Sequence, residues 1–249
     1  MKIVGIIPAR YNSVRFPGKP LVDMAGKPMI QRVYEQAQKV ALFQQVIVAT
    51  DDERIEAAVK RFGGDARMTA KTHQSGTDRL AEVARQLDAD ILVNVQGDEP
   101  FIAPEMIEQA IRPLLDDPAV AIGTLKHHIK TPDELLNPNV VKVITTPTGR
   151  AIYFSRSPIP FIKGKEMRQD GFAAFTFYRH IGLYAYRRDF LLTFASLPQT
   201  PLEMAEGLEQ LRALEHGYVI HVVETHHESL GVDTPEDMER ALAVLRGSS

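Results

Sequence analysis

Hydrophobic positions in the first half of the chain alternate between short continuous runs and longer segments in which apolar residues recur every three or four positions. Continuous runs are typical of strands buried on both faces of a parallel sheet, and the longer spacing is typical of helices that cover such a sheet. The runs predict strands at residues 2–8, 45–49 and 91–95. Strands that alternate with helices favour an α/β fold with a mostly parallel sheet flanked by helices.

Three helices are predicted in this half. The first is predicted from apolar residues at helical spacing, which are Met29, Ile30, Val33, Ala37 and Val40. The sequence Thr50-Asp51-Asp52-Glu53 has the form of a capping box, so a second helix should open there and stop at residues 63–64. Ser75-Gly76-Thr77-Asp78 predicts the start of a third helix, which runs to about residue 87.

The pattern changes in the second half. Strands are predicted at residues 140–146, 151–154 and 181–186, with longer, Pro-rich connections between them. We expect a single domain over residues 1–249 with a mixed β insertion at about 120–190, which covers the binding site or contacts another subunit. Thr200 to Glu203 predicts the cap of one long helix that reaches Glu215, followed by a strand at 218–224. The last helix is predicted at residues 238–245.

Composition narrows the classes of function. The chain has 249 residues, 44% of them hydrophobic, which is enough for one large α/β domain. A net charge of -3 and mixed charges argue against a nucleic-acid partner. The absence of cysteine excludes thiol nucleophiles, disulfides and Cys-ligated zinc, and it agrees with a cytoplasmic protein. The N-terminal apolar run is interrupted by Pro8 and Arg10, so no membrane span is expected.

A basic loop follows the first predicted strand. It contains Arg10, Arg15 and Lys19, and no Asp or Glu occurs between residues 1 and 22. Guanidinium forks and an ammonium group suit a polyphosphate, although a solvated basic loop is the alternative. A Walker loop is excluded because Ser13 stands where its first Gly belongs and Pro20 where Ser or Thr belongs. The chain also lacks the G-x-G-x-x-G motif, so side-chain cations would hold any phosphate.

Carboxylates follow two other predicted elements. Asp98 comes just after the strand at 91–95, and parallel strands place their carboxyl ends at one edge of the sheet, where ligands bind. Asp233 precedes the last helix, where an Asp is usually a helix cap. Thr234 fits that cap better, with Pro235 after it and Asp237 completing a capping box. Asp233 is then a candidate to join Asp98 in holding Mg²⁺, with a role in capping the helix as the alternative.

Ten segments in this order resemble one family. They are residues 6–11, 15–21, 26–30, 48–51, 75–79, 94–100, 153–156, 180–184, 208–212 and 231–237. Together they resemble the CMP-Kdo synthetase (3-deoxy-manno-octulosonate cytidylyltransferase) family over nearly the whole chain. The resemblance implies a nucleotidyltransferase fold similar to GT-A enzymes. It also implies conversion of CTP and Kdo to CMP-Kdo and pyrophosphate, which activates the sugar for lipopolysaccharide biosynthesis.

The resemblance also implies roles for individual residues. Arg10, Arg15, Lys19 and Asp98 would be catalytic, and Asp98 and Asp233 would bind Mg²⁺. The nucleotide site would contain Ala9, Arg10, Lys19, Ser75, Gly76, Arg79, Gln96 and Gly97. The sugar-binding residues would be Arg15, Arg156, His180, Tyr184, Glu209 and Gln210, with Arg156 suited to the sugar carboxylate. The family implies a homodimer.

Several alternatives stay open at this stage. Residues 161–179 depart from the family pattern in detail, which could alter the sugar pocket or a dimer contact. Enzymes that activate the 8-amino-8-deoxy derivative of Kdo share almost all of the same motifs, and a rival nucleotidylyltransferase could act on a sialic acid. A nucleotidylyltransferase acting on a sugar 1-phosphate is a rival with the same architecture. A glycosyltransferase would be expected to carry Asp-x-Asp where this chain has Asp98-Glu99-Pro100. A non-catalytic nucleotide-sensing module is the alternative from another class.

Overall fold

The structure is a computed structural model, and it describes residues 1–12, 16–73, 75–228 and 230–247. The chain forms two compact units. The first contains residues 1–108, 187–195 and 228–249, and the second contains residues 109–186 and 196–227. The α/β fold with a mostly parallel sheet flanked by helices agrees with the prediction from the hydrophobic pattern.

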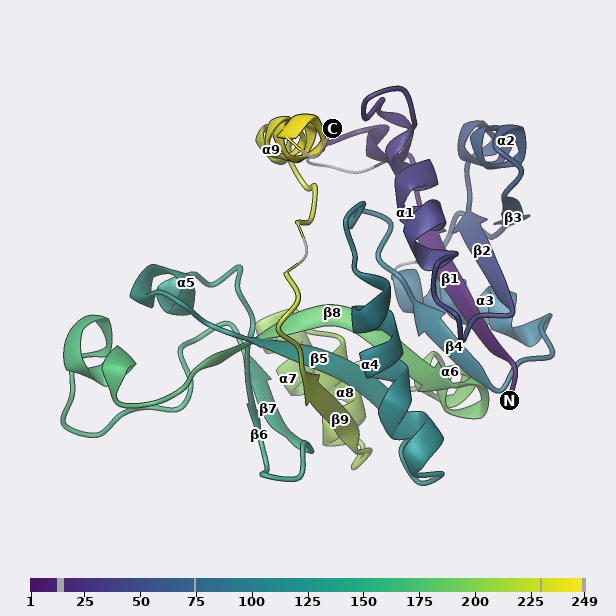
Figure 1. The fold of residues 1–249 in the computed structure, drawn as a ribbon. Coiled ribbons are helices and arrows are strands. Elements are labelled where there is room, and N and C mark those ends of the chain that lie inside the picture. The colour runs from purple at the N-terminus through teal and green to yellow at the C-terminus, as the bar shows by residue number, and fades with distance from the viewer. Residues whose placement is uncertain (13–15, 74, 229, 248–249) are drawn as a thin grey trace. The chain divides into compact units, whose positions relative to one another are not determined.

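The first unit is built on four parallel strands in the order β3-β2-β1-β4. Their bounds are β1 (Ile3–Ala9), β2 (Gln45–Thr50), β3 (Asp65–Met68) and β4 (Ile91–Asn94). β1 lies between β2 and β4, so that Ile6 pairs with Ile47 on one side and with Asn94 on the other (Figure 1). Because these strands are parallel, the loops after β1 and β4 leave the sheet at the same edge.

Helices flank this sheet. They are α1 (Met29–Ala37), α2 (Glu53–Arg61), α3 (Gly76–Arg85), α6 (Arg188–Phe194) and α9 (Pro235–Gly247), and α4 (Pro104–Asp116) continues into the second unit. The predicted cap of α3 is confirmed, since Ser75 and Asp78 form a capping box. The predicted cap of α2 at Thr50 is wrong. Thr50 stays in β2, where its carbonyl accepts from Thr69, and Asp52 caps α2 instead.

The last helix is attached to the N-terminal part of the first unit. The backbone N–H of Asp237 donates to Oγ1 of Thr234 at 3.2 Å, and the Thr234 N–H donates to Oδ2 of Asp237 at 3.0 Å, as the predicted capping box requires. Apolar residues from both ends of the chain then form one buried cluster, whose members are Met24, Met29, Val232, Met238 and Ala241. This cluster fixes the segment that carries Asp233 within the first unit.

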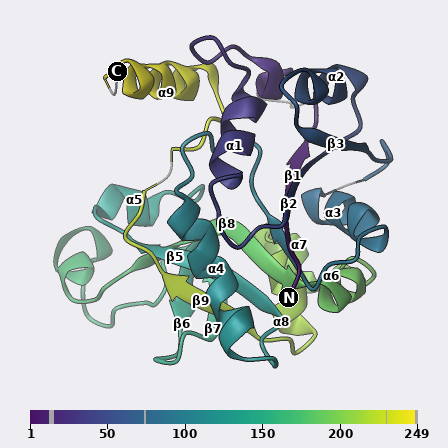
Figure 2. The same ribbon diagram turned by 45° about the vertical axis from the view of Figure 1, so that its right-hand side comes forward.

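The second unit contains a mixed sheet (Figure 2). β5 (Ile122–His128) is antiparallel to β8 (Tyr178–Arg187) and parallel to β9 (Ile220–Glu224). β6 (Lys142–Thr145) and β7 (Ala151–Ser155) form an antiparallel pair, and β6 also pairs with β8. β6, β7 and β8 are the strands predicted for the insertion, with β8 starting three residues earlier than expected, whereas β5 was not predicted.

The helices of the second unit correct one prediction. They are α5 (Pro132–Leu136), α7 (Pro201–Glu206) and α8 (Gln210–Glu215), with a short π-helical turn at Met167–Gly171. The capping box of Thr200 and Glu203 is confirmed, but the single helix expected to reach Glu215 is wrong. Gly207 adopts a left-handed conformation with φ of 61° and ends α7. In the described part of the chain, none of the helices has the length and apolarity needed to cross a membrane.

Candidate active site

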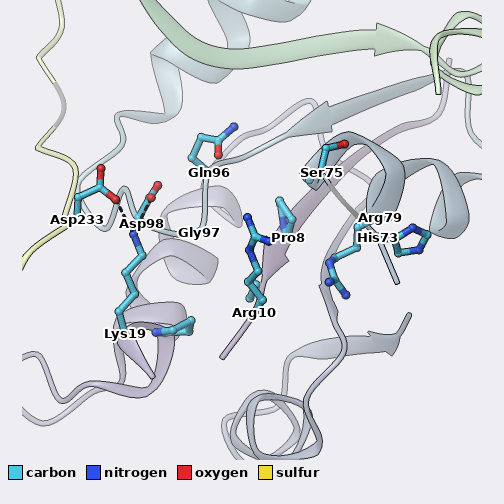
Figure 3. A pocket seen from close by; sticks show the side chains of 13 residues that line it. Pro8, Arg10, Lys19, His73, Ser75, Arg79, Gln96, Gly97, Asp98 and Asp233 are labelled. Carbon is cyan, nitrogen blue, oxygen red and sulfur yellow. Dashed lines mark hydrogen bonds and ion pairs between the residues drawn. The ribbon is translucent and has the colours of Figure 1, made fainter. Parts of the chain in front are cut away.

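A cavity of about 240 Å³ lies in the first unit beside the ends of β1 and β4 (Figure 3). It is lined by Pro8, Ala9, Arg10, Lys19, Pro20, His73, Ser75, Gly76, Arg79, Gln96, Gly97, Asp98 and Asp233. The lining contains every nucleotide and metal candidate that the sequence indicated. Arg15, the remaining candidate of the basic loop, falls outside the described residues. The structure thus brings together residues from four separate segments of the chain.

The loop after β1 folds back so that Lys19 returns to the strand end. The N–H of Gly18 donates to the carbonyl of Tyr11 at 2.8 Å, which joins the start of the loop to its end. Gly18 has a φ of 74° and caps a 3₁₀ turn at Lys19–Leu21, a conformation that favours glycine. Both Arg10 and Lys19 therefore face the cavity.

Lys19 lies between the two candidate carboxylates. Its Nζ donates to Oδ2 of Asp98 at 2.8 Å, to Oδ1 of Asp233 at 3.0 Å and to the carbonyl of Val232 at 2.9 Å. All three ammonium donors are used, and the Lys19 side chain is only 12% exposed. In Figure 3 the side chain reaches up to the two carboxylates at one side of the cavity. One positive charge thus offsets only one of the two negative charges, and the group keeps a net charge of about -1.

Arg10 differs from Lys19 in having no such partner. It is exposed, and its guanidinium makes no hydrogen bond or ion pair with any residue that the structure describes. In Figure 3 Arg10 lies between two sides of the cavity, one formed by Lys19 with Asp98 and Asp233, and the other by Ser75 and Arg79. A cation that is placed in a cavity but not neutralised there is available to an anionic ligand.

Two backbone features bring Asp98 and Asp233 to the same place. A Cβ atom at Gly97 would lie 2.7 Å from the carbonyl oxygen of Pro8, so only glycine lets the loop after β4 pack against β1. The N–H of Val232 donates to the carbonyl of Asp98 at 2.8 Å, which joins the segment before α9 to the same loop. Because Thr234 caps α9, the side chain of Asp233 is left to face the cavity.

The two carboxylates fit a divalent metal that also takes ligands from a substrate. Oδ2 of Asp98 and Oδ1 of Asp233 already converge on a single cation, the Lys19 ammonium. Within the described ranges, no group of three or more His, Cys, Asp or Glu residues is arranged to hold a metal. Mg²⁺ at nucleotide sites is commonly held by one or two carboxylates, with phosphate and water completing its octahedral coordination. The pair therefore suits Mg²⁺ better than a metal enclosed by protein ligands alone.

On the side of the cavity formed by Ser75, Gly76 and Arg79, the positive charge of Arg79 is paired with a negative one. The Arg79 guanidinium is 4% exposed and donates to Oδ2 of Asp51 at 2.8 Å and to Oγ1 of Thr69. Ser75 is occupied as the cap of α3, and Gly76 begins that helix. With its charge paired, Arg79 contributes shape and hydrogen-bond donors to this wall more than charge.

Sequence reasoning missed three residues of the lining, Pro8, Pro20 and His73. His73 contacts Oε2 of Glu82, which also accepts from the N–H of Ala70 at 2.9 Å. The Ala70 hydrogen bond, together with His73, lowers the pKa of Glu82 below its ordinary value. A lone histidine in a loop gives no periodic or motif signal. The prolines offered a weak one, since both lie inside segments that carry the family resemblance.

The remaining candidates lie in the second unit, around β7 and β8. The ring of His180 packs against Phe154 at 4.9 Å and Tyr184 at 5.4 Å between centroids, and its Nε2 lies 3.0 Å from Oγ1 of Thr124. Burial lowers the pKa of His180 to about 3. Burial, and secondarily the carboxylate of Glu209, raise the pKa of Tyr184 well above its ordinary value. Both rings are therefore neutral hydrogen-bonding groups near neutral pH.

Arg156 stands at the end of β7, beside the α7–α8 connection. Its Nε donates to the carbonyl of Glu206 at 2.7 Å, and a second guanidinium nitrogen lies 3.4 Å from the carbonyl of Gly207. Glu209 is the last residue of this connection and Gln210 the first of α8, and Gln210 is buried. The second unit thus places Arg156 near the start of α8 and joins Tyr184 to Glu209 electrostatically.

Comparison with known proteins gives a consistent result. The family model described as cytidylyltransferase matches residues 4–226. A protein of Geotalea uraniireducens named 3-deoxy-manno-octulosonate cytidylyltransferase is 60% identical to this chain. The alignment covers 99% of this chain and 100% of that protein. A protein of the same name from Geobacter sulfurreducens is 57% identical over the same shares of both chains.

Solved structures agree with these relatives. A CMP:2-keto-3-deoxy-manno-octonic acid synthetase complexed with CTP is 46% identical and superimposes with a TM-score of 0.94 over 100% of both chains. A 4-diphosphocytidyl-2C-methyl-D-erythritol synthase from Anaerococcus prevotii, at 15% identity and a TM-score of 0.63 over 98% of both chains, shares the fold. By family model, full-length identity and fold, the chain belongs to the 3-deoxy-manno-octulosonate cytidylyltransferase family.

Proposed function

We propose that this protein is an enzyme that converts CTP and Kdo to CMP-Kdo and pyrophosphate. The anomeric hydroxyl of Kdo attacks the α-phosphorus of CTP, the bond between that phosphorus and the bridging oxygen breaks, and pyrophosphate leaves. The observation that carries the proposal is the cavity in which Arg10, which has no ion-pair partner among the described residues, lies beside Lys19 and two carboxylates. It is supported by the names of full-length relatives and by a related structure that contains CTP.

In this proposal the cations of the basic loop hold the triphosphate. Negative charge builds on the β- and γ-phosphates as pyrophosphate leaves, so fixed positive charge nearby lowers the barrier. Arg10 is available for this as it stands, and Lys19 would turn from the carboxylates toward phosphate when a metal joins them. Mg²⁺ bound by Asp98 and Asp233 would supply Lewis-acid polarisation of the α-phosphate and would lower the pKa of the sugar hydroxyl.

The sugar acid would be bound by residues of the second unit. The guanidinium of Arg156 offers planar donors for the carboxylate, and His180, Tyr184, Glu209 and Gln210 offer hydrogen-bonding groups for hydroxyls. The low pKa of His180 makes it a poor base at neutral pH, which favours a hydrogen-bonding role.

The resemblance implies a second copy of this chain as partner. Phe161 is 81% exposed and Ile152 is 55% exposed, and both belong to the segment predicted as the insertion. Apolar side chains with this exposure favour an interface between subunits. We propose a homodimer that uses this segment.

Pyrophosphate release measured with a panel of substrates tests the reaction itself. With CTP and Mg²⁺, we expect turnover with Kdo and a slower or comparable rate with its 8-amino-8-deoxy derivative, and little with a sialic acid. CTP should be used faster than UTP or GTP, because the relatives of this chain are cytidylyltransferases. A faster rate with UTP or GTP would remove the cytidine assignment. No turnover with any of the sugar acids would favour a nucleotide-sensing module instead.

Substitution of Asp98 tests the metal assignment. Asp98→Asn keeps the size and hydrogen-bonding capacity of the side chain but removes the charge that holds the cation. We expect kcat to fall by at least about 100-fold with little change in melting temperature, because a fixed charge at the reacting phosphate is lost. Asp88→Asn is the matched control, since Asp88 is 90% exposed and lies outside the cavity. Full activity in Asp98→Asn would contradict the assignment.

The pKa of His180 predicts a difference in stability with pH. An unfolded His binds a proton near pH 6.5, whereas burial keeps native His180 neutral down to about pH 3, so its contribution weakens as pH falls. Between pH 7 and pH 5 the wild type should lose about 2 kcal/mol more unfolding free energy than His180→Gln. Urea unfolding of both proteins at the two pH values measures this difference in unfolding free energy. Effects of carboxylate titration are the same in both proteins and cancel in the comparison. Equal losses would mean that native His180 titrates normally.

A further inference from the structure

Lys142, at the start of β6, is a buried lysine that the proposed reaction does not use. Its side chain is 0% exposed, and burial lowers its pKa below the ordinary value. Nζ donates to the carbonyls of Asn137 at 3.0 Å and Val140 at 2.6 Å, and to that of Arg156. Within the part of the chain that is described, Lys142 forms no ion pair. A buried ammonium whose hydrogen bonds go only to backbone carbonyls is costly, and the nearby Glu206 carboxylate offsets only part of this cost, so the position of Lys142 calls for an explanation.

The three carbonyls that accept from Lys142 come from two segments: Arg156 itself and the turn that its side chain contacts. Asn137 and Val140 flank the turn between α5 and β6, and the third carbonyl is that of Arg156 itself. The same turn also receives the Arg156 side chain, because a guanidinium nitrogen donates to the carbonyl of Pro138 at 3.0 Å. Lys142 therefore fixes the backbone of Arg156 and the turn against which its guanidinium rests.

Glu206 holds Arg156 from the other side. Its Oε2 accepts the backbone N–H of Arg156 at 2.8 Å, and its Oε1 accepts the hydroxyl of Ser155 at 2.6 Å. Burial works to raise the pKa of Glu206, but the hydrogen bonds from Arg156 and Ser155 outweigh it and keep the pKa below its ordinary value. A charged group thus anchors each end of the Arg156 peptide: Lys142 holds the carbonyl and Glu206 holds the N–H.

The guanidinium itself is oriented without being neutralised. Its partners are the carbonyls of Glu206, Pro138 and Gly207, all of them uncharged backbone groups. Among the residues that the structure describes, the Arg156 guanidinium forms no ion pair, and the Glu206 carboxylate acts on it only at longer range, so its positive charge still attracts an anion. A fixed orientation with unpaired charge is what a guanidinium needs in order to bind a carboxylate with little reorganisation.

We propose that Lys142 is a positioning residue for the sugar acid: through its three carbonyl contacts it holds Arg156 in the orientation that binds the substrate carboxylate. Lys142 does not touch the substrate in this arrangement. The inference rests on the proposed function only in assigning Arg156 to the sugar carboxylate. The placement of Arg156 by Lys142 is a property of the second unit alone.

Steady-state kinetics of Lys142→Met tests the inference, because methionine fills similar space and donates no hydrogen bond. We expect the KM for Kdo to rise at least about tenfold with the KM for CTP within about twofold of wild type, since a displaced guanidinium weakens one substrate only. Lys126→Met is the matched control. Lys126 is also a partly buried lysine of this unit with a lowered pKa, but its Nζ donates to Thr145 and not to the Arg156 segment.

A double-mutant cycle with Arg156→Ala separates positioning from a general structural role. If Lys142 acts through Arg156, Lys142→Met should add no further rise in the KM for Kdo once Arg156 is alanine. Arg156→Ala with an unchanged KM for Kdo would refute the sugar-carboxylate assignment within the proposed function. A raised KM in Arg156→Ala but not in Lys142→Met, or additive effects of the two, would refute the positioning role of Lys142.

A variant that keeps a neutral donor covers the case in which methionine prevents folding. Lys142→Gln retains N–H groups for one or two of the carbonyls and should show a smaller rise in the KM for Kdo than Lys142→Met. If both variants fail to fold, or if both raise the KM values for CTP and Kdo alike, Lys142 is a structural residue and the proposal is wrong.

Discussion

The ion pairs of Lys19 with two carboxylates are the interaction on which the first unit's site depends. Two carboxylates from distant segments, Asp98 and Asp233, meet at one ammonium group. Without a cation between them, two such charges close together would repel each other and would favour separation of the segments. The same requirement explains why the position suits a metal, because a divalent ion placed there satisfies both carboxylates and releases Lys19 for phosphate.

The rest of the first unit serves to bring these groups together. Parallel strands place the loops after β1 and β4 at one edge, and glycine at position 97 allows their backbones to touch. Thr234 and Asp237 form the capping box of α9, so Asp233 is not needed as the cap. The hydrogen bond from Val232 to Asp98 joins the segment that carries Asp233 to the loop after β4. In the second unit the backbone of Arg156 is likewise held by two charged side chains, Lys142 and Glu206. Its guanidinium is therefore oriented without forming an ion pair with a described residue.

Much of this arrangement could be predicted from sequence where local rules decide the outcome. Three strands of the first unit (β1, β2 and β4), the caps at Ser75 and Thr234, and the residues of the basic loop follow from periodicity, capping chemistry and charge, whereas the short β3 was not predicted. Local rules failed where a tertiary or backbone preference overrode them: Thr50 is retained in β2 by pairing with Thr69, and Gly207 breaks the helix expected to reach Glu215. The sugar residues came from the family resemblance alone. His73 and Lys142 gave no signal, since nothing in a single sequence shows that a loop histidine lines a cavity or that a strand lysine is buried.

The central claim is that the cavity of the first unit binds the triphosphate of CTP through the cations of the basic loop. Calorimetric titration of CTP with Mg²⁺ into wild type and Arg10→Met tests it most directly, because Arg10 is exposed and its loss leaves the fold intact. We expect the affinity for CTP to fall at least about tenfold in the variant, with a smaller difference at high salt, because the lost interaction is electrostatic. Equal affinities of the two proteins for CTP would contradict the account.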